Sequence, residues 1–188
     1  MKILPFLLCS FLALTGCVQP TRSTGFVRPG ASQNKLPAGV PHRVAVFISG
    51  DLAIAGQAEE QFSTGLFELG FDVVERNQIA ALTNELHLSQ AGFIAPETAI
   101  QSGRLLGAAG VFVGNAVGER SATWTDTHLS MRLVDTTTGK TMWSVNAHDP
   151  RVIGVSTAIE TSIIFTTKEA LKALKKDIAT LSAGTVSN

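Results

Sequence analysis

One stretch of the chain decides the order of the elements: RVAVFISGDLAIAGQAEEQFSTGLFELGFDVVERNQIAAL, residues 43–82. Its first part, residues 43–49, is a nearly continuous apolar and β-branched run, which is typical of a strand covered on both faces. An amphipathic helix with apolar residues at i, i+4 and i+7 follows, and Gly70 is its natural C-terminal stop. A second strand over 71–74 and a second helix capped by Asn77 come next. This alternation predicts an α/β domain with crossover connections.

The rest of the domain predicts a helix, three strands and a long final helix. The helix starts at Pro96 and ends at Gly107. The strands span residues 109–117, residues 128–135 with strict alternation, and residues 140–145 as the antiparallel partner of the second. The final amphipathic helix spans residues 157–181, and its apolar stripe runs from Ile159 to Leu181. We therefore expect a single three-layer α/β domain with a mixed sheet, helices on both faces and a long C-terminal helix.

The start of the chain, MKILPFLLCSFLALTGC, has the pattern of an export signal. Lys2 precedes an apolar run of about a dozen residues, which is shorter than the roughly 20 that span a bilayer. The last four residues, Leu14-Thr15-Gly16-Cys17, resemble the bacterial lipobox, in which the cysteine is lipidated and the signal is removed before it. An ordinary signal peptide with a chance cysteine is the alternative. Because Val18 stands where inner-membrane lipoproteins usually carry Asp, the resemblance implies a lipid anchor in the outer membrane, facing the periplasm.

Composition divides the chain into a signal, a tether, one globular body and a tail. The predicted division is a signal peptide over 1–16, lipidated Cys17 with a flexible tether over 17–41, the α/β domain over 42–181 and a disordered tail over 182–188. Docking of Phe26 and Val27 on a neighbouring molecule is an alternative to a free tether. The body is long enough for one domain with its own core.

The residues that commonly carry chemistry form no recognisable site. The chain balances 15 Lys and Arg against 15 Asp and Glu, which argues against nucleic acid held by bulk charge. Cys9 leaves with the signal and Cys17 is lipidated, so no thiol remains for a disulfide, a metal or catalysis. The four histidines are scattered without an i, i+4 pair, and His148 and Asp149 point to opposite faces of an extended chain. With no glycine-rich phosphate loop either, we expect no catalytic residue, metal or cofactor, and no enzyme.

Three side chains are candidates for contact with another protein: Arg76, Trp124 and Glu160. Trp124 lies between threonines in what we expect to be a polar loop, where an indole ring suits a membrane or a protein partner. Arg76 follows the second strand, either as half of a solvated pair with Glu75 or as a contact to the next subunit. Glu160 lies at the start of the final helix. Trp143, by contrast, is expected in the core.

Several short segments, in their order and spacing, resemble the CsgG-like family of curli secretion-channel lipoproteins. The resemblance spans residues 43–176 and rests on Phe71 to Arg76, Ala80 to Leu82, Gly103 to Ala108, Leu133 to Asp135 with Thr138-Gly139, Trp143-Ser144, and Ala158 to Thr161. It implies an outer-membrane lipoprotein, a nucleotide-binding-like α/β domain without nucleotide chemistry, and ring-shaped self-assembly in secretion.

The chain departs from this family at two places. The channel-forming members insert two long β-hairpins, each of which needs two strands of about 9 to 11 residues and a turn. The corresponding segments here, residues 118–127 and 146–156, are too short for that. We therefore expect a short member of the family that lacks the transmembrane hairpins.

The residues and the resemblance together predict a non-catalytic, oligomeric scaffold or accessory component of an outer-membrane secretion or assembly system, of the curli-like or exopolysaccharide-export kind. The alternative is a lipoprotein that activates a peptidoglycan-synthesising penicillin-binding protein. The expected partners are the outer membrane through the lipid on Cys17, further copies of the same chain, and envelope secretion or cell-wall synthesis proteins.

Overall fold

The computed structural model describes residues 36–75, 77–79, 96–121, 124–152 and 159–184. Its elements in chain order are β1 (Arg43–Gly50), α1 (Leu52–Glu68), β2 (Asp72–Val73), α3 (Pro96–Leu105), β3 (Gly110–Arg120), β4 (Trp124–Asp135), β5 (Thr141–Val152) and α4 (Ile159–Gly184). Across these ranges, the helices lack the combination of length and apolarity that a membrane-spanning helix needs.

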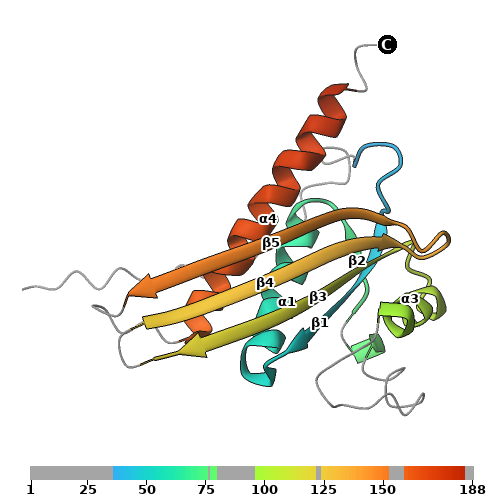
Figure 1. The fold of residues 1–188 in the computed structure, drawn as a ribbon. Helices are drawn as coiled ribbons and strands as arrows, with labels where there is room; N and C mark the ends of the chain where they lie inside the picture. The colour runs from blue at the N-terminus through green and yellow to red at the C-terminus, as the bar shows by residue number, and fades with distance from the viewer. Residues whose placement is uncertain (1–35, 76, 80–95, 122–123, 153–158, 185–188) are drawn as a thin grey trace, which may run out of the picture.

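The five strands form one mixed sheet in the order β2-β1-β3-β4-β5. Strand β1 pairs in parallel with β2 and β3, whereas β3, β4 and β5 form an antiparallel meander. Helices α1 and α4 pack on one face of the sheet, and α3 packs on the other face against β3 and β1 (Figure 1). This arrangement confirms the predicted three-layer α/β domain with its mixed sheet, helices on both faces and long C-terminal helix.

The larger core lies between the sheet and the α1–α4 layer. Phe112 of β3 is at its centre and is fully buried. Its ring makes edge-to-face contacts with Phe62, Phe71 and Trp143, at centroid distances of 5.2, 5.9 and 6.1 Å. Such pairs add to the stability that burial of the rings already gives. The contact also confirms that Trp143 packs against the core.

A smaller core lies between the sheet and α3. It contains Ala45 and Phe47 of β1 and Val111 and Val113 of β3, packed with Ala99 of α3. The alternate residues of β1 and β3 point into the larger core, because successive side chains of a strand face opposite ways. The continuous apolar run of residues 43–49 is therefore covered on both faces, as predicted.

Local sequence signals set both ends of α1. Oδ1 of Asp51 accepts a hydrogen bond from the backbone N–H of Ala53 at 3.0 Å and so caps the first turn. At the other end Gly70 has a φ of 98°, the left-handed conformation that glycine adopts at a helix stop. The predicted stop at Gly70 is confirmed.

Two other helix ends differ from the prediction. The backbone carbonyl of Glu75 accepts hydrogen bonds from the N–H groups of Gln78 and Ile79, so Asn77 already lies in the helix and is not its cap. Helix α4 continues to Gly184. Leu181, the last residue of the predicted apolar stripe, is 56% exposed. The last turns of α4 extend past the part of the helix that packs on the sheet (Figure 1).

The meander strands are longer than their sequence patterns predicted. Strand β3 continues to Arg120 and β4 begins at Trp124, with Glu119 paired to Asp126. The expectation that Trp124 lies in a polar loop is therefore wrong. The strand was not predicted because Thr125 and Thr127, which are fully buried on the helix side of β4, are polar. Apolar residues at these positions would have indicated a strand.

Buried hydroxyl groups hold α4 on β4. The Oγ1 atom of Thr127 lies 2.9 Å from Oγ of Ser162 and 2.6 Å from Oγ1 of Thr166. Thr166 also donates to the backbone carbonyl of Ser162 at 3.1 Å, and Ser162 contacts Asp149 on β5 at 3.3 Å. We call Thr127, Ser162 and Thr166 the hydroxyl cluster. It adds polar contacts between the helix and the strand to the apolar packing of the larger core.

Candidate functional site

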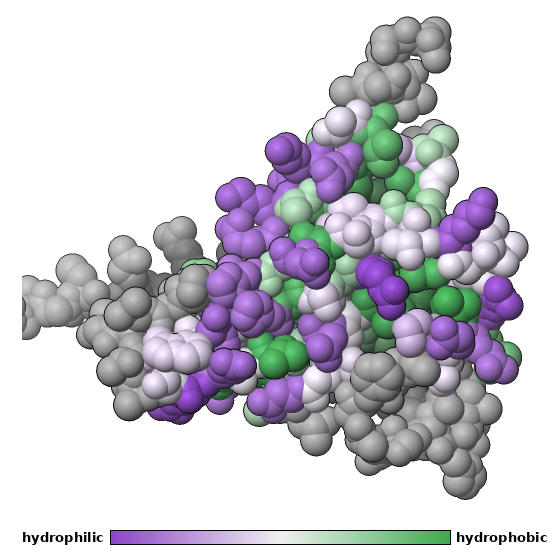
Figure 2. Space-filling model, viewed as in Figure 1, coloured by the Kyte–Doolittle hydropathy of each residue, from purple (hydrophilic) through white to green (hydrophobic). Residues whose placement is uncertain are grey.

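The face of β3, β4 and β5 that points away from α1 and α4 is called here the open face. Every second residue of β4 from Trp124 to Arg132 and of β5 from Ser144 to His148 points to it. These side chains are exposed or half-buried, whereas the intervening residues of β4 are buried against the helices. Figure 2 shows largely hydrophilic side chains over β4 and β5 on this face.

Three side chains on the open face form a compact group: Asp126, His128 and His148. Asp126 and His128 are two positions apart on β4, and His148 of β5 is paired directly with His128. The two imidazole rings are stacked, with centroids 4.2 Å apart and an interplanar angle of 17°. Nε2 of His148 lies 2.7 Å from Oδ1 of Asp126, and Nε2 of His128 lies 3.4 Å from Oδ2. We call this group the Asp-His cluster.

The electrostatic setting of the Asp-His cluster favours an ionised carboxylate. Burial raises the pKa of the Asp126 carboxyl, but the contact with His148 and the charge of both imidazoles lower it by more, so the pKa lies below its usual value. The side chain of Asp126 is 20% exposed, against 53% for His128 and 46% for His148. The cluster therefore consists of a carboxylate anion beside two imidazole rings, and it is accessible to solvent.

A register shift in the β4–β5 hairpin creates the cluster. Val134 pairs with Thr141 and Leu133 pairs with Trp143, so Met142 is an extra residue on β5. If the first of these pairings continued without the shift, Ala147 would face His128 and His148 would point to the helices. The bulge therefore decides that His148 reaches the open face.

The Asp-His cluster was not predicted, because its histidines lack the i, i+4 spacing that indicates a metal site on a helix. The available signal was Asp126 and His128 at i, i+2, which share a face on any strand. The third member could not be inferred, because it depends on the bulge. The prediction that His148 and Asp149 point to opposite faces is confirmed, since the carbonyl and carboxylate of Asp149 lie near Ser162 on the helix side.

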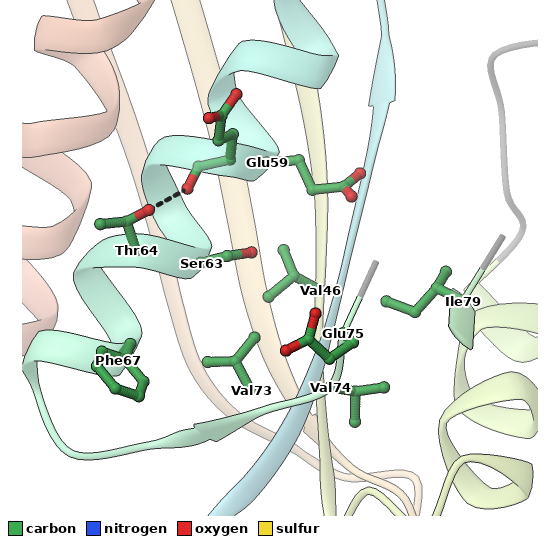
Figure 3. A pocket seen from close by; sticks show the side chains of 10 residues that line it. Val46, Glu59, Ser63, Thr64, Phe67, Val73, Val74, Glu75 and Ile79 are labelled. Carbon is green, nitrogen blue, oxygen red and sulfur yellow. Dashed lines mark hydrogen bonds between the residues drawn. The ribbon is translucent and has the colours of Figure 1, made fainter. Parts of the chain in front are cut away.

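A second feature is a cavity of about 570 Å³ between α1 and β2, shown in Figure 3. Its apolar walls include Val46, Phe67 and Val73, and Glu59 and Glu75 extend their carboxylates into it. An acidic cavity with apolar walls suits a basic side chain that also has an apolar stem. Its described lining holds carboxylates and hydroxyls.

The predicted contact residues are not brought together as one site. Trp124 is the first residue of β4 and is 39% exposed on the open face. Glu160 lies in the first turn of α4 and is half-buried, where a carboxylate interacts favourably with the helix N-terminus. Arg76 and Cys17 lie outside the described residues. Of the two that the structure describes, Trp124 shares a surface with the Asp-His cluster and Glu160 does not.

Comparisons with known proteins give one family match and several similar folds. The family model described as curli production assembly/transport component CsgG matches residues 61–118. That segment runs from α1 to β3. A comparison with curated protein sequences finds no significant match.

Three of the similar solved structures are of bacterial proteins. Lipoprotein GNA1162 from Neisseria meningitidis is 17% identical, with a TM-score of 0.53, over 74% of this chain and 99% of that one. A PelC dodecamer from Paraburkholderia phytofirmans is 17% identical, with a TM-score of 0.51, over 76% and 95%. The LpoB C-terminal domain from Salmonella enterica is 25% identical, with a TM-score of 0.49, over 60% and 86%. At these identities, the likeness to the first two concerns the fold.

Proposed function

We propose that this CsgG-like protein is a lipid-anchored, non-catalytic scaffold that faces the periplasm from the outer membrane. In this proposal it forms a homo-oligomer and serves as an accessory component of a secretion or assembly system, curli-like or for exopolysaccharide export. The observation that carries the proposal is the solvent-facing surface of the meander, which combines the open face with the long edge strand β5.

The edge strand supports contacts with another chain. Strand β5 runs from Thr141 to Val152 at one edge of the sheet, whereas the opposite edge, β2, has only two residues. An edge strand presents unpaired backbone N–H and C=O groups that can pair with a second chain. A long edge therefore favours an assembly in which a neighbouring subunit protects it.

The side chains of the open face also suit a protein interface. Val117, Trp124 and Met142 are 42%, 39% and 44% exposed, and they lie among polar residues of the meander. Interfaces commonly combine a few aromatic or Met anchors with polar surroundings. Trp124 is the proposed anchor on this face, with Arg76 and Glu160 as further contact candidates.

The comparisons support assembly at the level of the fold. A structure of similar fold, PelC, is a dodecamer, and the family model that matches residues 61–118 is that of an assembly and transport component. We extend the property of self-assembly to this chain by analogy of fold. The number of subunits is not part of the proposal.

The proposed anchor is Cys17, with residues 18–41 as the connection to the domain. Each buried CH₂ of an acyl chain contributes about 0.8 kcal/mol, so two or more chains hold a protein stably on a membrane. Cells that express the full chain should incorporate labelled palmitate into it, and Cys17→Ser should abolish incorporation and release the protein from the membrane fraction. Labelling of the Cys17→Ser variant would contradict the proposed site.

Oligomerisation is tested on the mature protein, without residues 1–16 and with Cys17→Ser. Size-exclusion chromatography with light scattering at tens of micromolar should give one discrete species larger than a monomer. Trp124→Ala should shift it towards smaller species, because it removes the proposed anchor. Leu181→Ala is the matched control, since this exposed side chain lies near the end of α4 on the opposite side of the sheet.

A monomer under these conditions would overturn the scaffold proposal and would favour a protein that acts on a partner one chain at a time, such as an activator of a penicillin-binding protein. An oligomer that Leu181→Ala disrupts and Trp124→Ala leaves intact would show that the helical layer, and not the open face, forms the interface.

A further inference from the structure

We propose that the Asp-His cluster binds a divalent transition-metal ion of the Zn²⁺ type. The site lies within one chain, with ligands from the paired strands β4 and β5 only. It does not depend on the oligomer or on the lipid anchor. It also differs from the sequence-based expectation that the chain holds no metal.

The ligand atoms already converge. One ligand atom from each of Asp126, His128 and His148 lies within 4.8 Å of the others. Tetrahedral zinc with bonds of about 2.0 to 2.2 Å needs its ligand atoms about 3.3 Å apart. The 3.4 Å separation of Nε2 of His128 and Oδ2 of Asp126 meets this need. Small rotations of the half-exposed imidazoles suffice for the third ligand.

The carboxylate shows a polar atom that lacks a proper partner. Oδ1 of Asp126 is shielded from solvent and has no assigned hydrogen-bond partner among the described residues, and Nε2 of His148 lies 2.7 Å from it as an ion-pair contact. To share a bound cation, these two atoms must move apart from 2.7 Å to about 3.3 Å, and rotation of the half-exposed His148 ring allows that. Glu119, exposed and paired opposite Asp126, adds negative charge on the same face. Like charges directly opposite on a sheet are unfavourable, and a bound cation relieves them.

The donor set selects the kind of metal. Two imidazoles and one carboxylate suit Zn²⁺, Cu²⁺ and Ni²⁺ better than Mg²⁺ or Ca²⁺, which prefer oxygen ligands. Three protein ligands leave a coordination position open to water, and the exposure of both histidines places that position at the surface. Bound metal would join β4 to β5 across their outer ends and hold the edge strand in register.

The test is titration of the mature Cys17→Ser protein, purified without a histidine tag, with ZnCl₂ by isothermal titration calorimetry, and with CoCl₂ by visible absorption. We expect one Zn²⁺ per chain and a cobalt d–d band of a four- or five-coordinate site that Zn²⁺ displaces. His128→Ala and His148→Ala should each abolish the band and weaken Zn²⁺ binding by at least tenfold. Asp126→Asn keeps the shape of the side chain and should weaken binding as well.

The control is His42→Ala, because His42 is an exposed histidine just before β1, on the far side of the sheet order from β5. It should bind Zn²⁺ as the parent protein does. Circular dichroism without metal should be unchanged in every variant, and the Tm without metal should fall only slightly in the variants of the Asp-His cluster, because each removes part of an ion pair at the surface. Equal binding by His128→Ala, His148→Ala and the parent, or half a metal per chain, would overturn a site made by one chain. Absence of binding by the parent would show that the cluster is only an ion pair, and it would leave the oligomer untouched.

Discussion

Replacing Thr127 and Thr125 separately by valine tests whether buried hydroxyl groups hold α4 on the sheet. Both threonines lie on the helix side of β4, and both are fully buried. They differ in one respect. Oγ1 of Thr127 has two hydroxyl partners, at 2.9 and 2.6 Å, whereas Oγ1 of Thr125 is buried without a hydrogen-bond partner among the described residues. Valine has the shape of threonine with a methyl group in place of the hydroxyl, so each change probes the oxygen alone.

The two changes should have opposite signs. Thr127→Val removes two hydrogen bonds of about 0.5 to 1.5 kcal/mol each, which lowers the free energy of unfolding by about 1 to 3 kcal/mol. Ser162 and Thr166 keep other partners, so no further penalty for an unpaired hydroxyl is expected. Thr125→Val removes a buried hydroxyl that is desolvated without compensation, so it should leave stability unchanged or raise it by about 1 kcal/mol.

Urea unfolding of the mature Cys17→Ser protein, followed by circular dichroism, measures both effects. The midpoint should fall for Thr127→Val and stay or rise for Thr125→Val at constant m-value. A change of 1 kcal/mol corresponds to about 2 to 4 °C in Tm for a chain of this size. Equal destabilisation by the two substitutions would refute the reasoning, because it would mean that the loss reflects the altered side chain in general and not its hydrogen bonds.

Three further predictions follow from the core, from one glycine and from the hairpin turn. Phe112→Ala should lower the free energy of unfolding by about 3 to 5 kcal/mol and Phe112→Leu by less, measured by urea unfolding, because the ring is fully buried among three other aromatic rings. Gly50→Ala should lower the free energy of unfolding by about 3 kcal/mol or more, because φ is 119° and a Cβ would lie 2.0 Å from the backbone oxygen of Ala116. Gly139→Ala is the comparison: φ is 70° and no atom lies within 4 Å, so it should lower the free energy of unfolding by about 1 to 2 kcal/mol. Hydrogen bonds from Thr138 and the N–H of Thr137 lower the pKa of Asp135. The stabilising effect of its carboxylate is therefore present above the unfolded pKa near 3.8 and is lost as the pH falls through the folded pKa. Asp135→Asn should flatten this part of the acid-unfolding curve, and an unchanged curve would contradict the assignment.

Residue patterns alone predicted much of the fold. The apolar run of residues 43–49, the stripe that ends at Gly70 and the alternation of residues 128–135 predicted the strands, the first helix and the faces that they bury. These predictions hold because side-chain periodicity reports directly which face of an element avoids water. Where polar residues were buried, as at Thr125 and Thr127, the same reasoning placed a loop where the structure has a strand.

The site could be predicted less well, because its members come from different strands. Trp124 was identified as an exposed contact candidate, and it is exposed, although it lies in a strand. The pairing of His148 with His128 was missed. It depends on the position of Met142 as an extra residue, which no local pattern of the hairpin sequence indicates.

The sequence by itself determined the class of the fold, the order of its elements and which face of each is buried, since these follow from local periodicity and from the chemistry of turns and caps. Only the tertiary structure decided the register of β4 against β5, the length of the meander and the meeting of Asp126 with His128 and His148. The physical reason is that side chains alternate along a strand, so one extra residue moves every later side chain to the other face. The register of β4 against β5 depends on how the whole sheet packs against α4, so it cannot be inferred from any one segment of the sequence.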